Sequence, residues 1–315
     1  MASLEGLFSG RSVRFLVPIV MLILLATAPL YASLYTLISL SNVFMYIVLT
    51  VGWAVFSGQT HYISLASAAF FGIGIYVSAM LGNVLPFPVV VFTGGLLSFL
   101  IALLVGLSSL RLRGMYFTIF TFGLSELIRH SVHWWEVNMT GTVGRWVVAV
   151  DPKTVYYAML ITVMLTVFVA HLIGRTRLGF ALRGIGESED AADHMGVNVN
   201  AVKIIAFALS TFFMGTAGAV MATRWTYIDP SIAFNPLFSF MPVLMAIFGG
   251  IGQIVGQIIG ATALTVLADI LLTKFPYYYM LSYGVILVFV ILFLPGGLME
   301  LQGAMKNWHK RSLVK

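Results

Sequence analysis

The sequence has no cysteine and very few charged residues. Without cysteine, it can form no disulfide framework, carry no thiol nucleophile and bind no metal through thiolates. Only 9% of the 315 residues are charged, whereas about a quarter are charged in a typical soluble domain. So few charges cannot cover a soluble surface of this size. The main solvent of this chain is therefore lipid.

What the sequence does contain is long apolar runs, and 60% of its residues are hydrophobic. A membrane-spanning helix needs about 20 such residues in a row. The runs predict about ten spans, near 15–31, 34–56, 61–82, 88–110, 115–134, 154–174, 203–224, 237–251, 254–273 and 278–295. The span at 237–251 is short, and Pro236 and Pro242 interrupt it, which is typical of a broken or re-entrant helix. We expect an all-α, polytopic transmembrane bundle forming one domain over residues 1–315.

The basic residues predict the orientation of these spans. Cytoplasmic loops of membrane proteins carry an excess of Lys and Arg. If the N-terminus is cytoplasmic and ten spans follow, most of the 17 basic residues fall on the cytoplasmic side. Both termini are therefore predicted to be cytoplasmic. The net charge of +6 has the same explanation, so it does not indicate nucleic acid as a partner.

The most polar stretch is the predicted cytoplasmic loop at about 175–202. Within it, residues 188–196 have the pattern of a short capped helix. Ser188 is a favourable N-cap, acidic residues follow in the first turn, His194 stands in the last turn, and Gly196 suits the left-handed position after the helix. Such a helix could dock into another protein or serve as a solvated connector. The pattern alone favours neither alternative.

Glycines recur at short intervals in the predicted span 61–82 and again from the end of span 237–251 into span 254–273. These residues are Gly72, Gly74, Gly249, Gly252, Gly256 and Gly260. The second group superficially resembles a dinucleotide fingerprint, but no strand precedes it and its spacing is wrong. Glycines four apart in an apolar helix allow a neighbouring helix to approach closely. We therefore interpret all six as helix-packing residues.

The sequence has no pattern typical of an enzyme. It has neither the glycine-rich phosphate loop of ATPases nor the paired histidines of zinc proteases. His130 and His133 share a helix face, yet no clear third metal ligand accompanies them. We predict that the chain binds no metal or cofactor and catalyses no reaction of its own.

A few charged residues lie inside the predicted spans. Glu126 and Arg129 lie in the fifth span, and Asp269 lies in the ninth. Charges within a membrane are costly and usually functional, so these side chains are candidates for a substrate path. Alternatively, Glu126 pairs locally with Arg129, three residues away, and with His130.

Several motifs, in order along the chain, resemble those of one transporter family. They lie at 64–76, 110–118, 178–198, 249–252 and 294–298. The first reads SLASAAFFGIGIY, which is similar to SLGHAAFFGIGAY, and the second reads LRLRGMYFT, similar to LRLRGxYFA. Together they identify a resemblance, over nearly the whole chain, to the LivM-type permease subunits of bacterial branched-chain amino acid ABC importers.

The resemblance implies a multi-pass protein of the bacterial inner membrane that works within a larger complex. Its expected partners are a second, related permease, two ATPase subunits and a periplasmic substrate-binding protein, with ATP and Mg²⁺ bound by the ATPases. The helix at 188–196 would be the coupling helix. The residues expected to contact an ATPase are Arg183, Glu187, Asp190, Ala191 and Gly196.

The chain departs from the family pattern at three places, one of which is the cytoplasmic loop, where Gly184 and Gly186 stand in place of the common Ala and Arg. Ala66 and Ser67 replace Gly-His, and the outer loop has Thr140 and Gly141 but one glycine fewer and no Asn or Asp. Ser67, Thr140 and Gly141 therefore join the candidates for the substrate path.

Three hypotheses for the function follow. The first is an importer permease for a branched-chain or hydrophobic amino acid or a similar small solute. The alternative is a stand-alone secondary transporter or channel, which would leave the capped helix without a role. A membrane-embedded enzyme is the third, and it lacks any acid–base, nucleophile or metal cluster.

Overall fold

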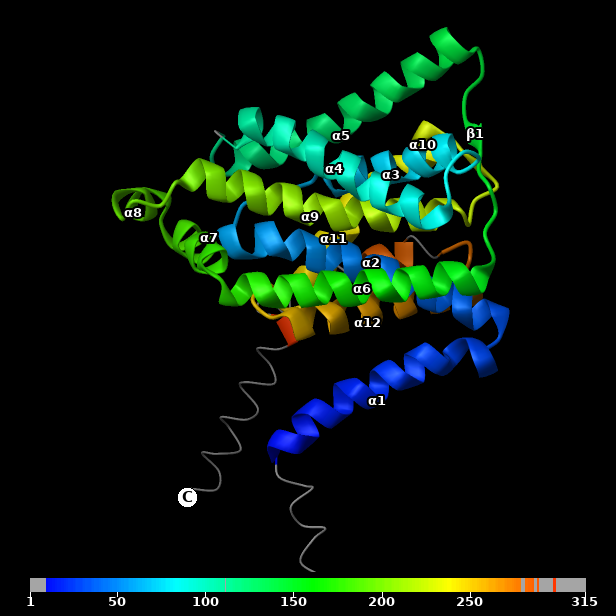
Figure 1. The fold of residues 1–315 in the computed structure, drawn as a ribbon, viewed down its shortest axis with the longest axis horizontal. Coiled ribbons are helices and arrows are strands. Elements are labelled where there is room, and N and C mark those ends of the chain that lie inside the picture. Colours follow the sequence, from blue (N-terminus) through cyan, green and yellow to red (C-terminus); the bar gives the residue numbers. More distant parts are fainter. Residues whose placement is uncertain (1–9, 111, 279–280, 286–287, 289–296, 299–315) are drawn as a thin grey trace, which may run out of the picture.

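The computed structural model describes residues 10–110, 112–278, 281–285, 288 and 297–298, with the side chains of residues 10–19 left out (Figure 1). The described chain is mainly helical. Its helices in order are α1 (Gly10–Tyr31), α2 (Leu34–Thr60), α3 (Ser67–Leu81), α4 (Phe87–Ser109), α5 (Met115–Trp135), α6 (Pro152–Arg175), α7 (Arg177–Glu187), α8 (Glu189–His194), α9 (Val199–Ala222), α10 (Pro230–Ala233), α11 (Leu237–Gly249) and α12 (Ile254–Lys274). A π-helical turn, η2 (Glu136–Thr140), follows α5.

Six helices of the described part are long and apolar enough to cross a membrane. They are α2, α4, α6, α9, α12 and the combined stretch Pro230–Gly249, which joins α10 to α11. The structure thus agrees with a polytopic helical bundle. The predicted tenth span, 278–295, and both termini lie largely or wholly outside the described residues.

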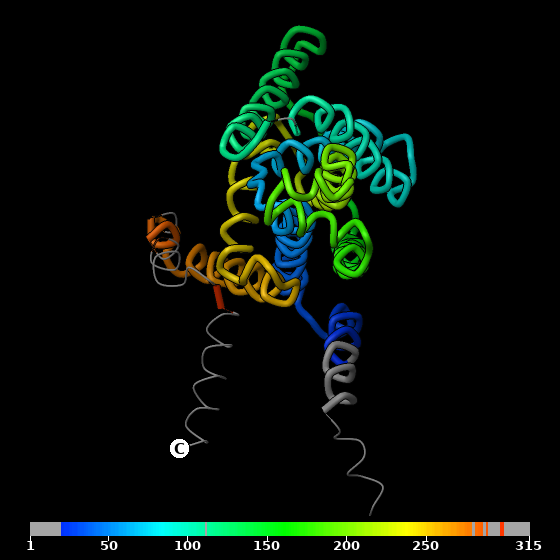
Figure 2. Tube along the Cα trace, turned by 90° about the vertical axis from the view of Figure 1, so that its left-hand side faces the viewer, coloured from blue at the N-terminus to red at the C-terminus, as the bar shows by residue number. Residues whose placement is uncertain are grey.

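The long helices form one bundle with two distinct ends. Helix α9 packs most extensively against α3 and α4, and α2 packs against α6, α9 and α12. Helices α7 and α8 lie at one end, and the two short strands β1 (Arg145–Trp146) and β2 (Tyr227–Ile228) pair antiparallel at the other (Figure 1). Seen end-on, α1 lies at the edge of the bundle (Figure 2).

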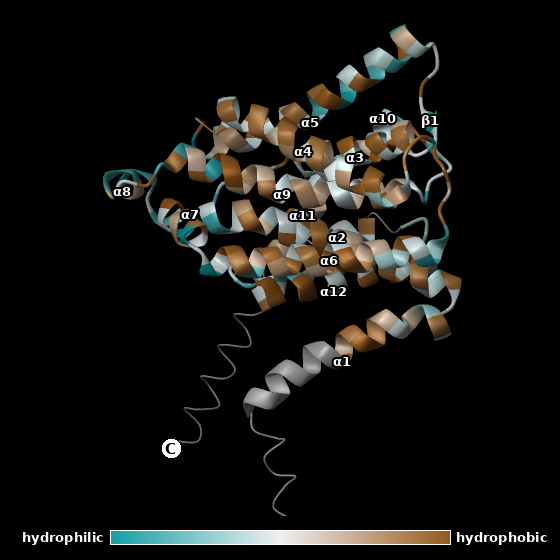
Figure 3. Ribbon diagram, viewed as in Figure 1, coloured by the Kyte–Doolittle hydropathy of each residue, from teal (hydrophilic) through white to brown (hydrophobic). Residues whose placement is uncertain are grey.

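Polarity follows this arrangement. Apolar residues cover the long helices, and hydrophilic residues gather at α7 and α8 (Figure 3). Many large apolar side chains on α4, α5 and α6 are exposed, among them Leu104, Ile119 and Phe168, each at least 59% exposed. Such a surface is costly in water and suits contact with lipid.

The predicted span at 61–82 is wrong in its first six residues. His61 ends α2 with a left-handed backbone (φ 59°), and residues 61–66 are non-helical. Side chains of three helices bind the carbonyls of this stretch: Trp53 Nε1 donates to Ser64 O (2.8 Å), Thr118 Oγ1 to Ile63 O (2.8 Å) and Ser239 Oγ to Leu65 O (2.7 Å). Irregular backbone is tolerated at membrane depth when it is satisfied inside the protein in this way.

Glycines allow α3, α4 and α9 to pack with their backbones in near contact. A Cβ added at Gly74 would lie 2.0 Å from the carbonyl oxygen of Gly215, and one added at Gly218 would lie 2.0 Å from that of Phe71. A Cβ at Gly94 would lie 2.8 Å from the Cβ of Ala219. No side chain fits at these distances, so glycine is required there.

The other predicted packing glycines divide into two groups. A Cβ at Gly72 would meet the ring of Phe234 at 2.2 Å, and one at Gly249 would meet the carbonyl oxygen of Gly256 at 1.9 Å. Gly260 faces Met245 O at 2.3 Å. Gly252 is different, because no heavy atom lies within 4 Å of a Cβ built there. It lies in the turn between α11 and α12, so the packing prediction is wrong for Gly252 within this chain.

The glycine contacts predict that Gly74→Ala destabilises the bundle. The new methyl group has no room beside the backbone of Gly215, so α3 and α9 must separate. We expect a loss of about 1–3 kcal/mol in the free energy of unfolding, the usual cost of overpacking. The measurement is the thermal unfolding midpoint of the detergent-solubilised protein, followed by tryptophan fluorescence.

The matched control is Gly123→Ala in α5, where nothing lies within 4 Å of the added Cβ. Alanine should there be neutral or stabilising by up to about 1 kcal/mol, because it lowers the entropy of the unfolded chain. Equal midpoints for the two variants would contradict the close approach of α3 and α9.

Candidate functional site

The helix predicted at 188–196 is present as α8, and its caps are confirmed. Ser188 is the N-cap, and its Oγ accepts a hydrogen bond from the backbone N–H of Ala191 (3.3 Å). Glu189 lies in the first turn, and His194 lies in the last. Gly196 follows with φ 83°, a conformation that glycine adopts at no steric cost.

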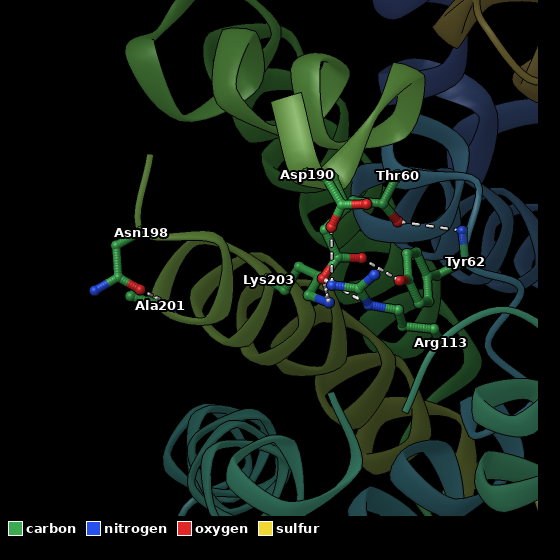
Figure 4. A network of polar contacts seen from close by, with 8 residues as sticks. Thr60, Tyr62, Arg113, Asp190, Asn198, Ala201 and Lys203 are labelled. Atoms are coloured by element: carbon green, nitrogen blue, oxygen red, sulfur yellow. Dashed lines mark hydrogen bonds and ion pairs between the residues drawn. The ribbon is translucent and has the colours of Figure 1, made fainter. Parts of the chain in front are cut away.

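A carboxylate of α8 is bound by groups from two other parts of the chain. Lys203 Nζ in α9 donates to Glu189 Oε1 at 2.9 Å, and the hydroxyl of Tyr62 donates to Glu189 Oε2 (Figure 4). The ammonium of Lys203 also lies 4.7 Å from the centroid of the Tyr62 ring. Lys203 is fully buried, so its charge depends on these partners for compensation.

Arg113, in the link between α4 and α5, makes a second contact with α8. Its Nη2 lies 3.1 Å from Asp190 Oδ1, and its Nε lies 3.9 Å from Glu189 Oε1. The side chains of Arg113 and Asp190 are 62% and 72% exposed, so solvent screens their attraction. We therefore expect this pair to contribute little to the position of α8. The Glu189–Lys203 pair is therefore the main anchor of α8.

The surroundings of Glu189 stabilise its charged form. Burial alone would raise the pKa of Glu189. Hydrogen bonds from Tyr62 and Lys203, together with the positive charges of Lys203 and Arg113, outweigh burial and lower this pKa below its ordinary value of 4.5. Glu189 is therefore ionised when α8 is in place.

The side of α8 away from this anchor is open. Ala192 is buried and packs with Ile185 and Val199. The exposed residues of α8 and its C-cap are Asp190, Ala191, Asp193, His194 and Met195. Met195 is 86% exposed, which is unusual for a large apolar side chain. Helix α8 thus combines a fixed inner side with an outer side of mixed charged and apolar character.

Helix α7 was not predicted from the sequence, and it joins α8 to the bundle. Arg183 lies on α7, where its Nη2 donates to Gly174 O at the end of α6 (2.6 Å) and its guanidinium stacks 4.8 Å from the Phe180 ring. Glu187 is the last residue of α7 and is exposed. Both residues line a cavity of about 500 Å³ between α2, α6, α7 and the start of α12.

Two of the candidate groups for the substrate path bind close neighbours. Glu126 pairs with Arg129 on the same helix (2.5 Å), as the local alternative predicts. Asp269 accepts hydrogen bonds from Ser39 Oγ (2.6 Å) and Tyr35 OH (3.2 Å), which joins α12 to α2. These groups lie on different helices, and no contact joins the two pairs within the described chain.

The remaining candidates lie elsewhere. Ser67 begins α3 and is buried, and its Oγ has no hydrogen-bond partner among the described residues. Thr140 ends η2, where its Oγ1 donates to Glu136 O (2.7 Å), and Gly141 follows with φ 72°. Glu136, which the sequence analysis missed, fixes this loop: it is fully buried and accepts from Gly144 N (2.8 Å) and Tyr76 OH (3.2 Å).

The anchor predicts that Lys203→Met loosens α8. Removing the ammonium leaves the Glu189 carboxylate part-buried with a weaker set of partners. We expect the free energy of local opening to fall by about 1–3 kcal/mol. Hydrogen–deuterium exchange of residues 188–199 measures it. Arg113→Gln is the control, and it should change exchange much less, because its ion pair is exposed.

The same experiment has a defined pH dependence. A lowered pKa in the folded state means that Glu189 stabilises the native position of α8 fully above pH 4.5 and loses this effect as the pH falls through the lowered pKa. In Lys203→Met the pKa of Glu189 rises, so α8 should open at higher pH than in the wild type. Identical exchange profiles in wild type and Lys203→Met would contradict the anchor.

Comparison with known proteins gives the family of this chain. The family model described as "Branched-chain amino acid transport system / permease component" matches residues 35–294. The high-affinity branched-chain amino acid transport system permease protein LivM of Escherichia coli (strain K12) is 28% identical, over 93% of this chain and 76% of the relative. The LivM protein of Salmonella typhimurium is also 28% identical, over 82% of this chain and 68% of the relative.

A more distant likeness covers a part of the chain. The autoinducer 2 import system permease protein LsrC of Escherichia coli (strain K12 / DH10B) is 27% identical over 35% of this chain and 34% of its own length. No solved structure matches the chain. Since the family model spans most of the sequence, this multi-pass helical membrane protein belongs to the branched-chain amino acid transport system permease family.

Proposed function

We propose that this chain is a transmembrane permease subunit of an ABC importer in the bacterial inner membrane. It forms the translocation path for a branched-chain or hydrophobic amino acid or a similar small solute. A periplasmic binding protein delivers the solute, a second permease completes the path, and two partner ATPases bind ATP and Mg²⁺ and supply the energy. The observation that carries this proposal is α8, which is anchored to α9 on one side and exposed on the other.

The anchor of α8 supports a role in transmitting force. A helix that docks into an ATPase transmits movement only if its own attachment is firm. Glu189 and Lys203 form a short, largely buried ion pair, so they join α8 directly to α9, the helix in most extensive contact with α3 and α4. A solvated connector has no need of a buried lysine, since burying a charge is costly.

The exposed side of α8 supports contact with a protein partner. Asp190 and Asp193 provide acidic groups, and Met195 provides an adaptable apolar side chain of the kind common at binding surfaces. Ala191 lies between them and is small. A small exposed residue in the middle of a helix allows a partner to approach its backbone. The expected contact residues are Asp190, Ala191 and Gly196 in and after α8, together with Arg183 and Glu187 of α7.

The test of this function is co-purification. The chain is tagged and expressed with the proteins encoded beside it, extracted in mild detergent, and assayed for ATPase activity with and without loaded binding protein. A stable complex whose ATPase activity rises with loaded binding protein is the expected result. A chain that purifies alone and moves solute into liposomes without ATP would contradict the proposal and favour a secondary transporter or channel.

The exposed position of Ala191 gives a sharper prediction. Ala191→Trp adds a bulky group to the outer side of α8 without entering the core, so folding should be unchanged. Stimulated ATPase activity and uptake should each fall about tenfold or more, which corresponds to about 1.4 kcal/mol of lost contact.

The matched control is Asn200→Trp, an equally bulky change at an exposed residue in the first turn of α9. It should leave uptake near the wild-type rate. Normal uptake by a correctly inserted Ala191→Trp variant would show that α8 does not contact the ATPase.

A further inference from the structure

Arg224 lies at the end of the bundle opposite α8 and has no ion-pair partner among the described residues. It follows Thr223, the C-cap of α9, and its side chain is only partly exposed. Its Nη1 donates to the side-chain oxygen of Asn42 in α2. No Asp or Glu in the described chain lies within 4.0 Å of its guanidinium nitrogens.

This arrangement leaves a positive charge uncompensated. Arginine stays charged at any physiological pH, and its guanidinium has five N–H donors in a fork that matches a carboxylate. Asn42 is neutral, so it accepts a hydrogen bond from the guanidinium of Arg224 without balancing the positive charge of that group. Arg129 and Arg145 are also partly buried, and both have carboxylates nearby. Arg224 therefore differs from them, because its guanidinium is available to pair with a bound anion.

Arg224 lines a cavity of about 310 Å³ between α2, α6 and the end of α9. Ile38, Val150 and Val155 give the cavity an apolar wall. Ser41 and Thr223 also line it, and the hydroxyl of each is bonded to its own helix: Ser41 Oγ donates to Leu37 O (2.7 Å), and Thr223 Oγ1 donates to Val220 O (2.8 Å). The cavity thus combines an aliphatic lining with one charged group.

The start of α6 also borders the cavity. Pro152 lines the cavity and is the first residue of α6, and the side chain of the N-cap Asp151 makes no capping hydrogen bond. The positive end of the helix dipole therefore lies at the edge of this cavity, next to the side chain of Asp151.

We propose that this cavity binds a small aliphatic carboxylate. The guanidinium of Arg224 pairs with the carboxylate, and Ile38, Val150 and Val155 contact the hydrocarbon chain. The volume is at the lower end of the range for small-molecule sites, about 300–1,000 Å³, which suits a ligand the size of one amino acid. The assignment of this cavity to the substrate path rests on the proposed function. The binding of a carboxylate in the cavity does not depend on that function.

The test uses isocaproate, which has a branched aliphatic chain and a carboxylate, as the probe. The full chain, with whatever subunits co-purify, is placed in nanodiscs of neutral lipid. Binding is measured by saturation-transfer-difference NMR over a concentration series. We expect saturable binding of isocaproate and about tenfold or more weaker binding of isohexanol, which lacks the charge-assisted hydrogen bonds.

Two variants test the assignment to Arg224. Arg224→Gln removes the charge and should weaken isocaproate binding about tenfold or more. Asn42→Asp keeps the arginine and the size of the side chain but supplies an internal carboxylate, so it should weaken binding in the same way. It also adds an ion pair, which keeps the variant folded. Lys153→Gln removes an exposed charge beside Pro152 and should leave binding unchanged.

Several results would overturn the proposal. Unchanged isocaproate binding in both Arg224→Gln and Asn42→Asp would do so, as would equal binding of isohexanol. Binding that disappears when anionic lipid is added would assign Arg224 to lipid phosphate. The ATPase assay of the wild-type complex is an independent readout. If the wild-type complex binds no isocaproate but its stimulated ATPase is intact, the cavity alone is refuted. If it binds isocaproate but shows no stimulated ATPase, the importer alone is refuted.

Discussion

The close approach of α9 to α3 and α4 is the constraint on which the rest of the structure depends. Between helices in lipid there is little hydrophobic driving force, so association relies on close packing and hydrogen bonds. Gly74, Gly94, Gly215 and Gly218 allow the backbones to touch, and Thr211 Oγ1 of α9 donates to Ser98 O of α4 (3.3 Å). Helix α9 is thereby fixed in the middle of the bundle.

A fixed α9 connects the two features that we assign to transport. Lys203 near its start binds Glu189 of α8, and Arg224 just beyond its end lines the opposite cavity. The helical residues between them span about 30 Å at 1.5 Å per residue, the thickness of a bilayer core. A movement of α8 therefore acts first on α9. Arg224, which we propose to bind the carboxylate, lies just beyond the other end of this helix.

The sequence predicts the local features well and the long-range ones poorly. The caps of α8 follow from Ser188 and Gly196 alone, because capping depends on residues a few positions apart. The burial of Lys203 and its ion pair do not follow from the sequence, because its partners Glu189 and Tyr62 come from other segments of the chain. The only indication in the sequence is a lysine at the start of an apolar span. Residues 61–66 appear helical by hydropathy, because that scale ignores hydrogen bonds from distant side chains such as Ser239.

The most direct test of the coupling account uses the absence of cysteine, because any introduced thiol is unique in the chain. Met195→Cys, at the exposed end of α8, is treated with a short thiol-to-amine cross-linker in the purified complex. The account predicts a cross-link to the ATPase subunit, absent from a Trp146→Cys variant at the opposite end. Cross-linking that is equal in both variants, or absent from Met195→Cys in an active complex, would contradict the account.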